Sequence, residues 1–310
     1  MTKVRIATFN CENLFARYRF GQNVPAPMPE FSINDLSFDI HSTRSKRITG
    51  KAIKDIDADI VCLQEVENQP VLDRFNSEFL ARSRNKRYRH RVLIDGNDPR
   101  HIDVAFLSRY PIKSIRSHRH DRNPANTAQA FSRDCVRVDI DVDGDVLTLY
   151  GNHFKSMIGG RRDTRARRVD QAERVHEILT EDWGPDFEGD FVVLGDLNDY
   201  PQRGDGTTTA LGKLLDDDNL VNVNDRLPRD DRWTHYFARE NEYRQLDYLL
   251  LSKQLDDASG NPVPERELRG LPWRADEVDT DRYDDVGHSS PKASDHVPLY
   301  VDVLVGEANA

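Results

Sequence analysis

Two polar residues, Asp196 and Asn198, follow directly after the apolar run that ends at Gly195. A run rich in β-branched residues and bounded by glycine is typical of a buried strand. In an extended chain, alternation would point Asp196 and Asn198 the same way and turn Leu197 aside. A carboxylate and a carboxamide placed in this way can hold a metal ion or activate a water. The same pattern also occurs in turns, where Asp and Asn satisfy nearby backbone groups.

Polar side chains also stand at the ends of other strand-like runs. Three follow early runs and three precede late ones: Asn10, Glu65 and His153, then Asp247, Asp295 and His296. If the late strands run antiparallel to the early ones, their starts lie beside the early ends. The sequence therefore predicts that these motifs converge on one edge of the fold.

Six short motifs occur in a fixed order between residues 9 and 299: FN, LQEVEN, NHFKS, GDLN, QLDYLLLS and SDHVPL. In order and spacing they resemble the endonuclease/exonuclease/phosphatase superfamily. This group includes pancreatic deoxyribonuclease, the abasic-site endonucleases, sphingomyelinases and inositol polyphosphate 5-phosphatases. The resemblance covers essentially the whole chain, so residues 1–310 are expected to form a single domain.

The chemistry that suits these residue types is phosphoester hydrolysis, which needs a cation on the phosphoryl oxygens and an activated water. The resemblance implies that Glu65, helped by Asn10 and Asp295, binds Mg²⁺ or Mn²⁺. Such a sparse set of oxygen ligands suits either ion. Asp196 would orient or deprotonate the water, and Asn198 would fix that carboxylate and touch the phosphate.

The two histidines have expected roles as well. Asp247 would hold His296 in its tautomer and favour its protonated form, so that His296 contacts the phosphoryl group and His153 faces it from the other side. The competing interpretations are a core histidine bonded to a backbone carbonyl for His153, and a purely structural hydrogen bond for the Asp247–His296 pair.

Other residues carry weaker signals. Arg109 and Lys155 are candidates for contacting substrate phosphate, or are solvated basic residues. Tyr236 and Tyr243 could stack on a base or a lipid, although aromatic core packing is the favoured interpretation. Residues 81–122 carry 12 basic and 4 acidic residues, which is either a track for a polyanion or a solvated face paired with acidic neighbours.

Composition indicates a soluble enzyme. The chain has 310 residues, a formal net charge of −10 and a mean hydropathy of −0.73, and it contains no apolar run long enough to span a membrane. The first strand begins by about Val4, which leaves no room for a signal peptide, and a cytoplasmic location is expected. Three cysteines are expected to be small buried thiols. The oligomeric state is not predicted.

The periodicity of apolar residues predicts the elements that position these motifs. Helices are expected over Ser45–Ile56, after Pro70, and over Arg165–Leu179, with strands over His101–Leu107 and Cys135–Ile140. Phe20–His41 and Asp256–Pro291 are expected to be long loops. Alternating elements alone suggest an α/β layered domain. The resemblance implies a four-layer α/β sandwich, in which two mixed β-sheets pack face to face with helices outside.

The first functional interpretation is a divalent-metal-dependent phosphodiesterase, specifically a nuclease that hydrolyses DNA or RNA by in-line attack of an activated water. His153 and the N-x-E-N-L-F pattern from Asn10 are similar to deoxyribonuclease and to many bacterial nucleases. The residues after Asn198 and Asp247 depart from the inositol phosphatases. The alternative is a phosphatase or phosphodiesterase acting on a small phosphoester, such as a lipid head group or a sugar or inositol phosphate. A catalytically inactive binding module is disfavoured, because Glu65, Asp196 and His296 are all present.

Overall fold

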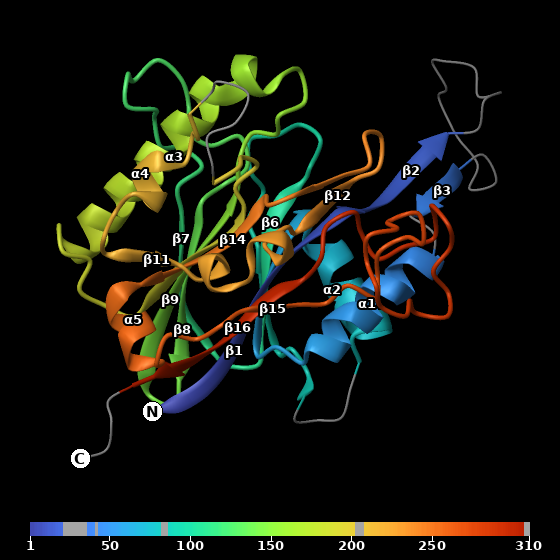
Figure 1. Cartoon of the computed structure of the whole chain (residues 1–310), viewed down its shortest axis with the longest axis horizontal. Helices are drawn as coiled ribbons and strands as arrows, with labels where there is room; N and C mark the ends of the chain where they lie inside the picture. The colour runs from blue at the N-terminus through green and yellow to red at the C-terminus, as the bar shows by residue number, and fades with distance from the viewer. Residues whose placement is uncertain (21–35, 41–42, 82–85, 202–207, 307–310) are drawn as a thin grey trace.

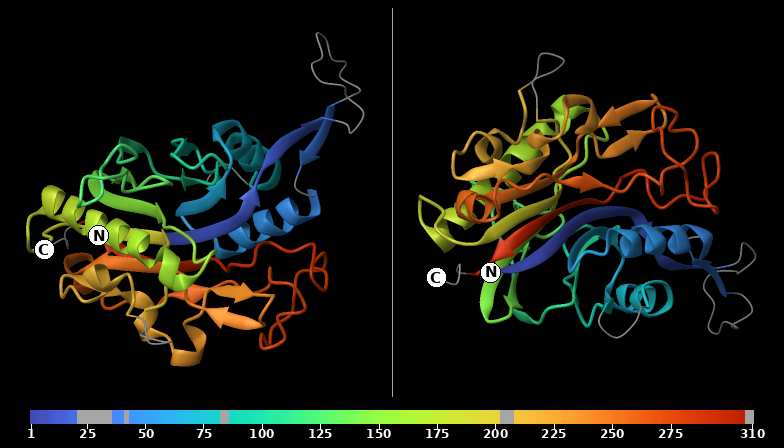
Figure 2. Two further views of the ribbon diagram at one scale, coloured as in Figure 1. Left: turned by 90° about the horizontal axis from the view of Figure 1, so that it is seen from above. Right: turned by 60° about the horizontal axis from the view of Figure 1, so that its bottom comes forward.

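Two six-stranded mixed sheets pack face to face in the computed structural model, which describes residues 1–20, 36–40, 43–81, 86–201 and 208–306 (Figures 1 and 2). The first sheet has the order β15-β16-β1-β4-β6-β5: Glu265–Arg266, Leu299–Val305, Thr2–Leu14, Ile60–Val66, Asp103–Ser108 and His90–Leu93. The second has the order β11-β14-β10-β9-β8-β7: Leu220–Asn222, Asp247–Ser252, Phe191–Asp196, Asp145–His153, Val136–Val142 and Ile112–Ser117.

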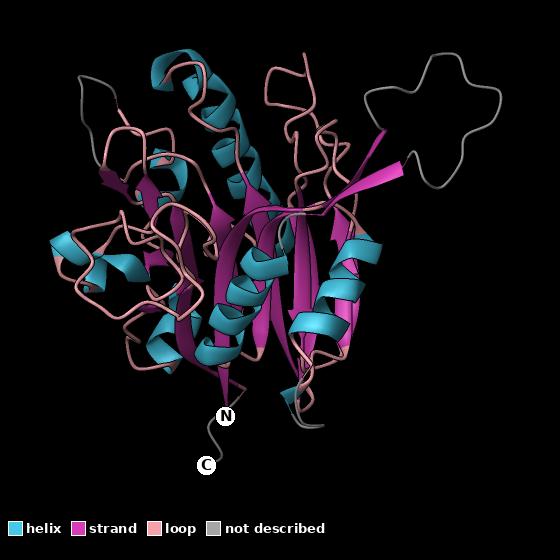
Figure 3. Ribbon diagram, turned by 90° about the vertical axis from the view of Figure 1, so that its right-hand side faces the viewer, coloured by secondary structure: helices cyan, strands magenta, loops and turns pink. Residues whose placement is uncertain are grey.

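Helices cover the outer faces of both sheets, which gives four layers (Figure 3). The first sheet is covered by α1 (Thr43–Ile56) and α2 (Gln69–Phe79), and the second by α3 (Arg161–Trp183) and α4 (Gly212–Leu215). The short α5 (Lys253–Ala258) follows β14. Two ribbons complete the description: β2 (Ala16–Phe20) with β3 (Leu36–Ile40), and β12 (His235–Phe237) with β13 (Glu242–Arg244). The expected four-layer α/β sandwich is confirmed.

The central strands are apolar on both faces because each face packs against another layer. In β1, Val4 and Ile6 enter the core between the sheets, whereas Ala7 and Phe9 pack under the helices. In β10, Val192 enters the core between the sheets and Val193 packs under α3. Burial on both faces explains why β10 reads as a continuous apolar run rather than as a polar and apolar alternation.

The topology brings the ends of early strands beside the starts of late ones. β10 runs parallel to β9 and antiparallel to β14, so Asp196 is level with both His153 and Asp247. β1 runs parallel to β4 and antiparallel to β16. The antiparallel arrangement expected for the late strands is therefore confirmed.

Glycine is required where β9 and β10 approach each other. Gly195 has φ of 135°, and a Cβ built on it would lie 1.9 Å from the carbonyl oxygen of Asn152. A side chain at this position would push the two strands apart just before Asp196.

Two expected loops contain regular structure. The segment Phe20–His41 includes β3, which pairs with β2, while residues 21–35 and 41–42 lie outside the described part of the chain. The segment Asp256–Pro291 contains the end of α5 and β15. Among the described residues, no helix has the length and apolar character needed to cross a membrane.

Candidate active site

A cavity of about 520 Å³ opens where β1, β4, β9 and β10 end. Seven of the eight side chains expected to act in catalysis or metal binding line it: Asn10, Glu65, His153, Asp196, Asn198, Asp295 and His296. The eighth, Asp247, is fully buried and hydrogen-bonded to His296. The structure therefore brings together residues that lie up to 286 positions apart in the sequence.

Glu65 reaches the cavity through a β-bulge. Val61 and Leu63 pack under the helices, so strict alternation along β4 would send Glu65 to that outer face. Instead the register with β6 shifts between Leu63 and Val66, and Glu65 has φ of 63°. A bulge of this kind re-aims a side chain, and here it turns the carboxylate into the cavity.

Asp196 is a buried carboxylate held from two sides. Its Oδ2 accepts a hydrogen bond from Asn10 Nδ2 at 3.0 Å, and its Oδ1 accepts one from the backbone N–H of Asn198 at 2.9 Å. Asn198 has a backbone φ of 52°, in the left-handed region, so the chain turns after β10 at a residue that itself lines the site. Burial raises the pKa of Asp196 to about 7, which suits a group that must take up a proton near neutral pH.

His296 lies between two carboxylates. Its Nδ1 is 2.7 Å from Asp247 Oδ2, which also accepts a hydrogen bond from Thr234, and its Nε2 is 3.8 Å from Asp196 Oδ2. Burial favours the neutral ring, but the charge and hydrogen bond of Asp247 outweigh it and raise the pKa of His296 to about 10. His296 is therefore a cationic hydrogen-bond donor at neutral pH.

His153 lies on the opposite side of Asp196 and has the opposite character. Its Nδ1 faces the carbonyl oxygen of Ile102 at 3.4 Å, and its Nε2 lies 3.7 Å from Asp196 Oδ2 and 4.0 Å from Glu65 Oε1. Burial, reinforced by the charge of Arg133, holds the pKa of His153 well below its usual range. His153 is a neutral imidazole, and its carbonyl contact agrees in part with the interpretation as a core histidine.

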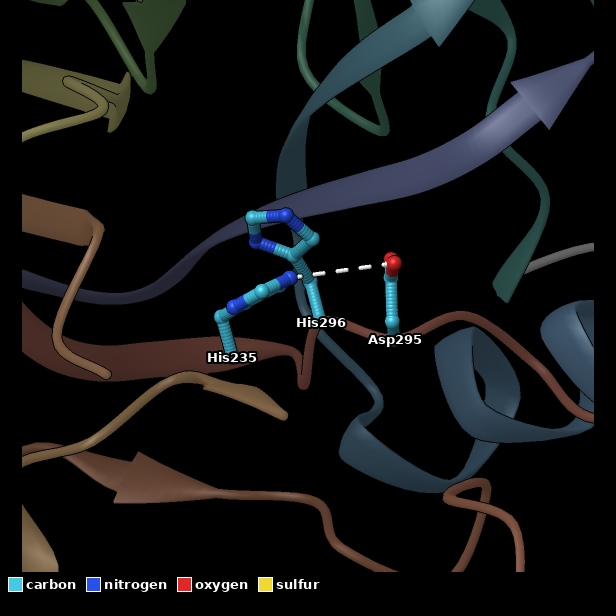
Figure 4. Close-up of side chains that lie close together, drawn as sticks. All are labelled: His235, Asp295 and His296. Carbon is cyan, nitrogen blue, oxygen red and sulfur yellow. Dashed lines mark ion pairs between the residues drawn. The ribbon is translucent and has the colours of Figure 1, made fainter. Parts of the chain in front are cut away.

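The residues expected to bind metal supply hard oxygen atoms, but not all in the expected way. Asn10 Oδ1 accepts the backbone N–H of Glu12, so Asn10 presents its amide nitrogen to Asp196 and Glu65. The role of the Asn10 oxygen as a metal ligand stays a prediction. Asp295 Oδ2 lies 3.7 Å from Nε2 of His235, and both side chains are close to His296 (Figure 4).

The charges around the cavity fit a divalent cation. Burial raises the pKa of Glu65, and it raises the pKa of Glu12 to about 7, in part because Asp295 is near. Burial also acts against ionisation of Asp295, but His235 outweighs it and holds its pKa well below the usual range. A group of partly buried carboxylates that share one cavity favours binding of a cation such as Mg²⁺ or Mn²⁺.

The sequence did not identify several ionisable residues that line the cavity, among them Glu12, Arg100, Arg133 and His235. Arg133 is almost fully buried, and its guanidinium donates to the carbonyl oxygen of Phe154, which also accepts from Asn198. In the sequence, Arg133 was marked only by its position just before the strand expected over Cys135–Ile140, which gave no reason to place it in the site. His235 comes from β12, whose three residues gave no strand pattern strong enough to identify.

Arg109 is not brought to the cavity. It follows β6, which runs antiparallel to β4, so it lies at the opposite edge of the sheet from Glu65. There it pairs with Asp57 and Asp59. This placement corrects the expectation that Arg109 contacts substrate phosphate.

Lys155 lies beside the cavity, next to its lining residue Ser156, whose backbone and side-chain oxygens accept from Lys155 Nζ.

The basic segment 81–122 is largely paired with acidic groups in its described part. Examples are Lys86 with Asp57, Arg91 with Asp73 and Arg116 with Asp182. This pairing favours the interpretation as a solvated face over that of a polyanion track. Residues 82–85 of the segment lie outside the described part of the chain.

Comparison with known proteins identifies the family of this chain and solved structures with a similar fold. A model described as the endonuclease/exonuclease/phosphatase family matches residues 5–262. No curated protein sequence gives a significant match.

Similar solved structures include truncated TDP2 of Caenorhabditis elegans, with 16% identity, 97% of each chain covered and a TM-score of 0.57. The human Nocturnin catalytic domain with bound sulfate is 15% identical over 98% of this chain and 95% of its own, with a TM-score of 0.57. A mannosyl-6-phosphatase of Bacteroides thetaiotaomicron is 12% identical over 97% and 99%, with a TM-score of 0.58. At these identities the likeness establishes the fold.

Proposed function

This chain belongs to the endonuclease/exonuclease/phosphatase family, whose members hydrolyse phosphoesters, and we propose that it is a divalent-metal-dependent phosphodiesterase that cleaves nucleic acid. The observation that carries the proposal is the position of Asp196. It is a buried carboxylate with a pKa of about 7, at the end of β10 and between the neutral His153 and the cationic His296.

Asp196 orients the attacking water and accepts its proton. Its two oxygens are fixed by Asn10 and by the backbone of Asn198, so the carboxylate is held in place before substrate binds. A base whose pKa lies near the working pH combines a large ionised fraction with useful basicity.

The phosphoryl group is bound by donors on both sides of Asp196. His296 is cationic and contacts a phosphoryl oxygen, with Asp247 fixing its ring. Asn198 and the guanidinium of Arg133 are the donors on the other side. His153 lines that side as well, but with Nδ1 facing the carbonyl oxygen of Ile102 its neutral ring carries no proton on Nε2. Donors that are already oriented stabilise the negative charge that builds up on the phosphoryl oxygens in the transition state.

Glu65 and Asp295 would hold the divalent cation, with Glu12 also lining the cavity nearby. When bound, the cation supplies charge neutralisation for the anionic phosphoester. Mg²⁺ and Mn²⁺ both suit carboxylate ligands with open positions for water.

The test is a substrate panel with each metal and with EDTA. The purified protein is incubated with single- and double-stranded DNA, RNA, abasic DNA and small phosphomonoesters. We expect metal-dependent cleavage of at least one nucleic acid, and loss of that cleavage in Asp196→Asn. Hydrolysis of the small monoesters with no cleavage of any nucleic acid would overturn the nuclease assignment in favour of a phosphatase.

A further inference from the structure

A second cavity, of about 680 Å³, adjoins the candidate active site. Tyr200 and Arg244 line both cavities, so the two meet at these side chains. The rest of the second cavity is formed by β13 with the preceding Asn241, by residues 229–230 and 232–233, by Pro201 and Glu277, and by Gln245. Gln245 directly precedes Leu246 of the active-site wall. A substrate held at Asp196 can therefore extend past Tyr200 and Arg244 into the second cavity.

Aromatic rings form one part of the wall. Tyr200, Trp233 and Tyr243 all line the cavity. The rings of Trp233 and Tyr243 meet edge to face, with their centroids 4.8 Å apart. The hydroxyl oxygen of Tyr243 also accepts a hydrogen bond from the backbone N–H of Glu277, and this bond holds the tyrosine ring in place. Rings held in this way stack on a planar ligand at a small cost in side-chain entropy.

Gln245 adds a buried donor to this cavity. Its side chain is only 7% exposed, and among the described residues its amide Nε2 has no hydrogen-bond partner. A buried donor left unpaired is costly, so a ligand that accepts from Nε2 gains that bond in full. A side-chain amide suits the edge of a nucleobase, which presents adjacent donors and acceptors.

The charges of the second cavity are balanced. Arg229, Arg232 and Arg244 face Asp230, Glu242 and Glu277 on the same wall. Balanced charge gives little attraction for a further phosphate, so the cavity does not have the character of a polyanion track. Fixed rings, one unpaired amide and neutral charge together favour a planar polar group.

We propose that this second cavity binds the nucleobase of the nucleotide next to the scissile phosphate, with Tyr243 stacking on the base and Gln245 donating to its edge. The inference rests on the proposed function and makes the substrate a nucleotide ester rather than a sugar or lipid phosphate. Of the two tyrosines left open by the sequence, Tyr236 is 2% exposed and packs in the interior, whereas Tyr243 lines this cavity.

A series of p-nitrophenyl phosphodiesters tests the proposal, because its members share the same leaving group and differ only in the other substituent. The substituents are thymidine, the corresponding abasic deoxyribose, and methyl, with the nucleoside attached through its 3′ and its 5′ oxygen in separate esters. For wild type we expect kcat/KM for one thymidine ester to exceed that for its abasic counterpart by about fivefold or more, the lower range for one base–aromatic stack.

Variants then locate the effect. Tyr243→Leu keeps apolar volume but removes the ring, and it should bring the thymidine-to-abasic ratio close to one, whereas Tyr243→Phe should preserve the ratio. Trp273→Leu is the matched control, because Trp273 is half exposed, carries Arg282 over its ring and lines neither cavity. Circular dichroism and the melting temperature establish that each variant is folded.

A ratio near one in wild type, or an unchanged ratio in folded Tyr243→Leu, would overturn the inference while leaving the proposed function intact. If wild type hydrolyses none of the esters with Mg²⁺ or Mn²⁺ and cleaves no nucleic acid, the proposed function fails instead. The inference is then judged by titration calorimetry with thymidine 5′- and 3′-monophosphate. The inference is supported if wild type binds the thymidine monophosphates more tightly than the abasic sugar phosphates and Tyr243→Leu loses this difference. Equal binding of the two kinds of ligand by wild type overturns it.

Discussion

At the scale of single residues, the site is organised by two histidines with opposite protonation states. Asp247 makes His296 a cation, whereas burial and the nearby positive charge of Arg133 keep His153 neutral. Asp196 lies between the two rings, with its Oδ2 3.7 Å from Nε2 of His153 and 3.8 Å from Nε2 of His296. The same residue type thus serves two roles because its buried neighbours differ.

Asp196→Asn should lower kcat by about 10²-fold or more, because it removes the base while keeping the volume of the side chain. The melting temperature should stay close to that of wild type. Asp190→Asn is the matched control, since Asp190 stands just before the other end of β10 and bonds Gln254. A near-wild-type rate for Asp196→Asn would place the catalytic base elsewhere.

Asp134→Asn should stabilise the protein at pH 7 but not at pH 4. Burial raises the pKa of Asp134 to about 6 although Ser117 and the His118 N–H bond to it, whereas an unfolded aspartate titrates near 3.9. The folded state therefore binds the proton more tightly, and wild type loses stability as the pH rises from about 4 to about 6. The asparagine should recover roughly 1–3 kcal/mol at pH 7.

Urea unfolding of Asp134→Asn and wild type at both pH values measures this difference. An equal change in the free energy of unfolding at pH 4 and pH 7 would contradict the assignment of a raised pKa.

At the scale of elements, the ends of strands were predictable and the irregularities were not. The alternation and glycine signals located the ends of β9 and β10, and with them His153 and Asp196. Glu65 depends on a bulge between β4 and β6, which arises from long-range pairing and leaves no local pattern. Arg109 was misplaced for the same reason, since the direction of β6 decides which edge of the sheet it occupies.

Gly195→Ala should destabilise the fold and impair activity together. The added Cβ would meet the carbonyl oxygen of Asn152 at 1.9 Å, which forces apart the strands that carry Asp196 and His153. The expected loss is roughly 2 kcal/mol or more in the free energy of unfolding.

Gly144→Ala is the control for backbone strain in this experiment. Gly144 also has a positive φ, of 108°, but a Cβ there meets no atom within 4 Å among the described residues. It should cost only about 1 kcal/mol. Equal melting temperatures for the two variants would show that the β9–β10 contact is not tight.

At the scale of the whole molecule, the two ends of the chain meet in one sheet. β16 pairs with β1 from Thr2↔Val305 to Thr8↔Leu299, and Asp295 and His296 lie in the segment that leads into β16. The family model ends at residue 262, so this last strand and two site residues lie beyond it. We propose that residues 1–310 form one domain.

Deleting residues 299–310 should abolish cooperative unfolding, because it removes four buried apolar residues from the core between the sheets: Leu299, Val301, Val303 and Val305. Thermal unfolding followed by circular dichroism measures this. A truncated chain that melts cooperatively near the wild-type temperature would contradict a single domain.

The central claim is that the partly buried carboxylates of Glu65 and Asp295 bind a divalent cation that the reaction requires. The most direct measurement is cleavage of the preferred nucleic acid by metal-stripped protein as Mg²⁺ is added back, for wild type and for Glu65→Gln. We predict no cleavage in EDTA, recovery with added Mg²⁺, and a clearly higher Mg²⁺ requirement with a lower maximal rate for Glu65→Gln. Full activity of the stripped wild-type protein in EDTA, or an unchanged Mg²⁺ requirement in the variant, would contradict the account.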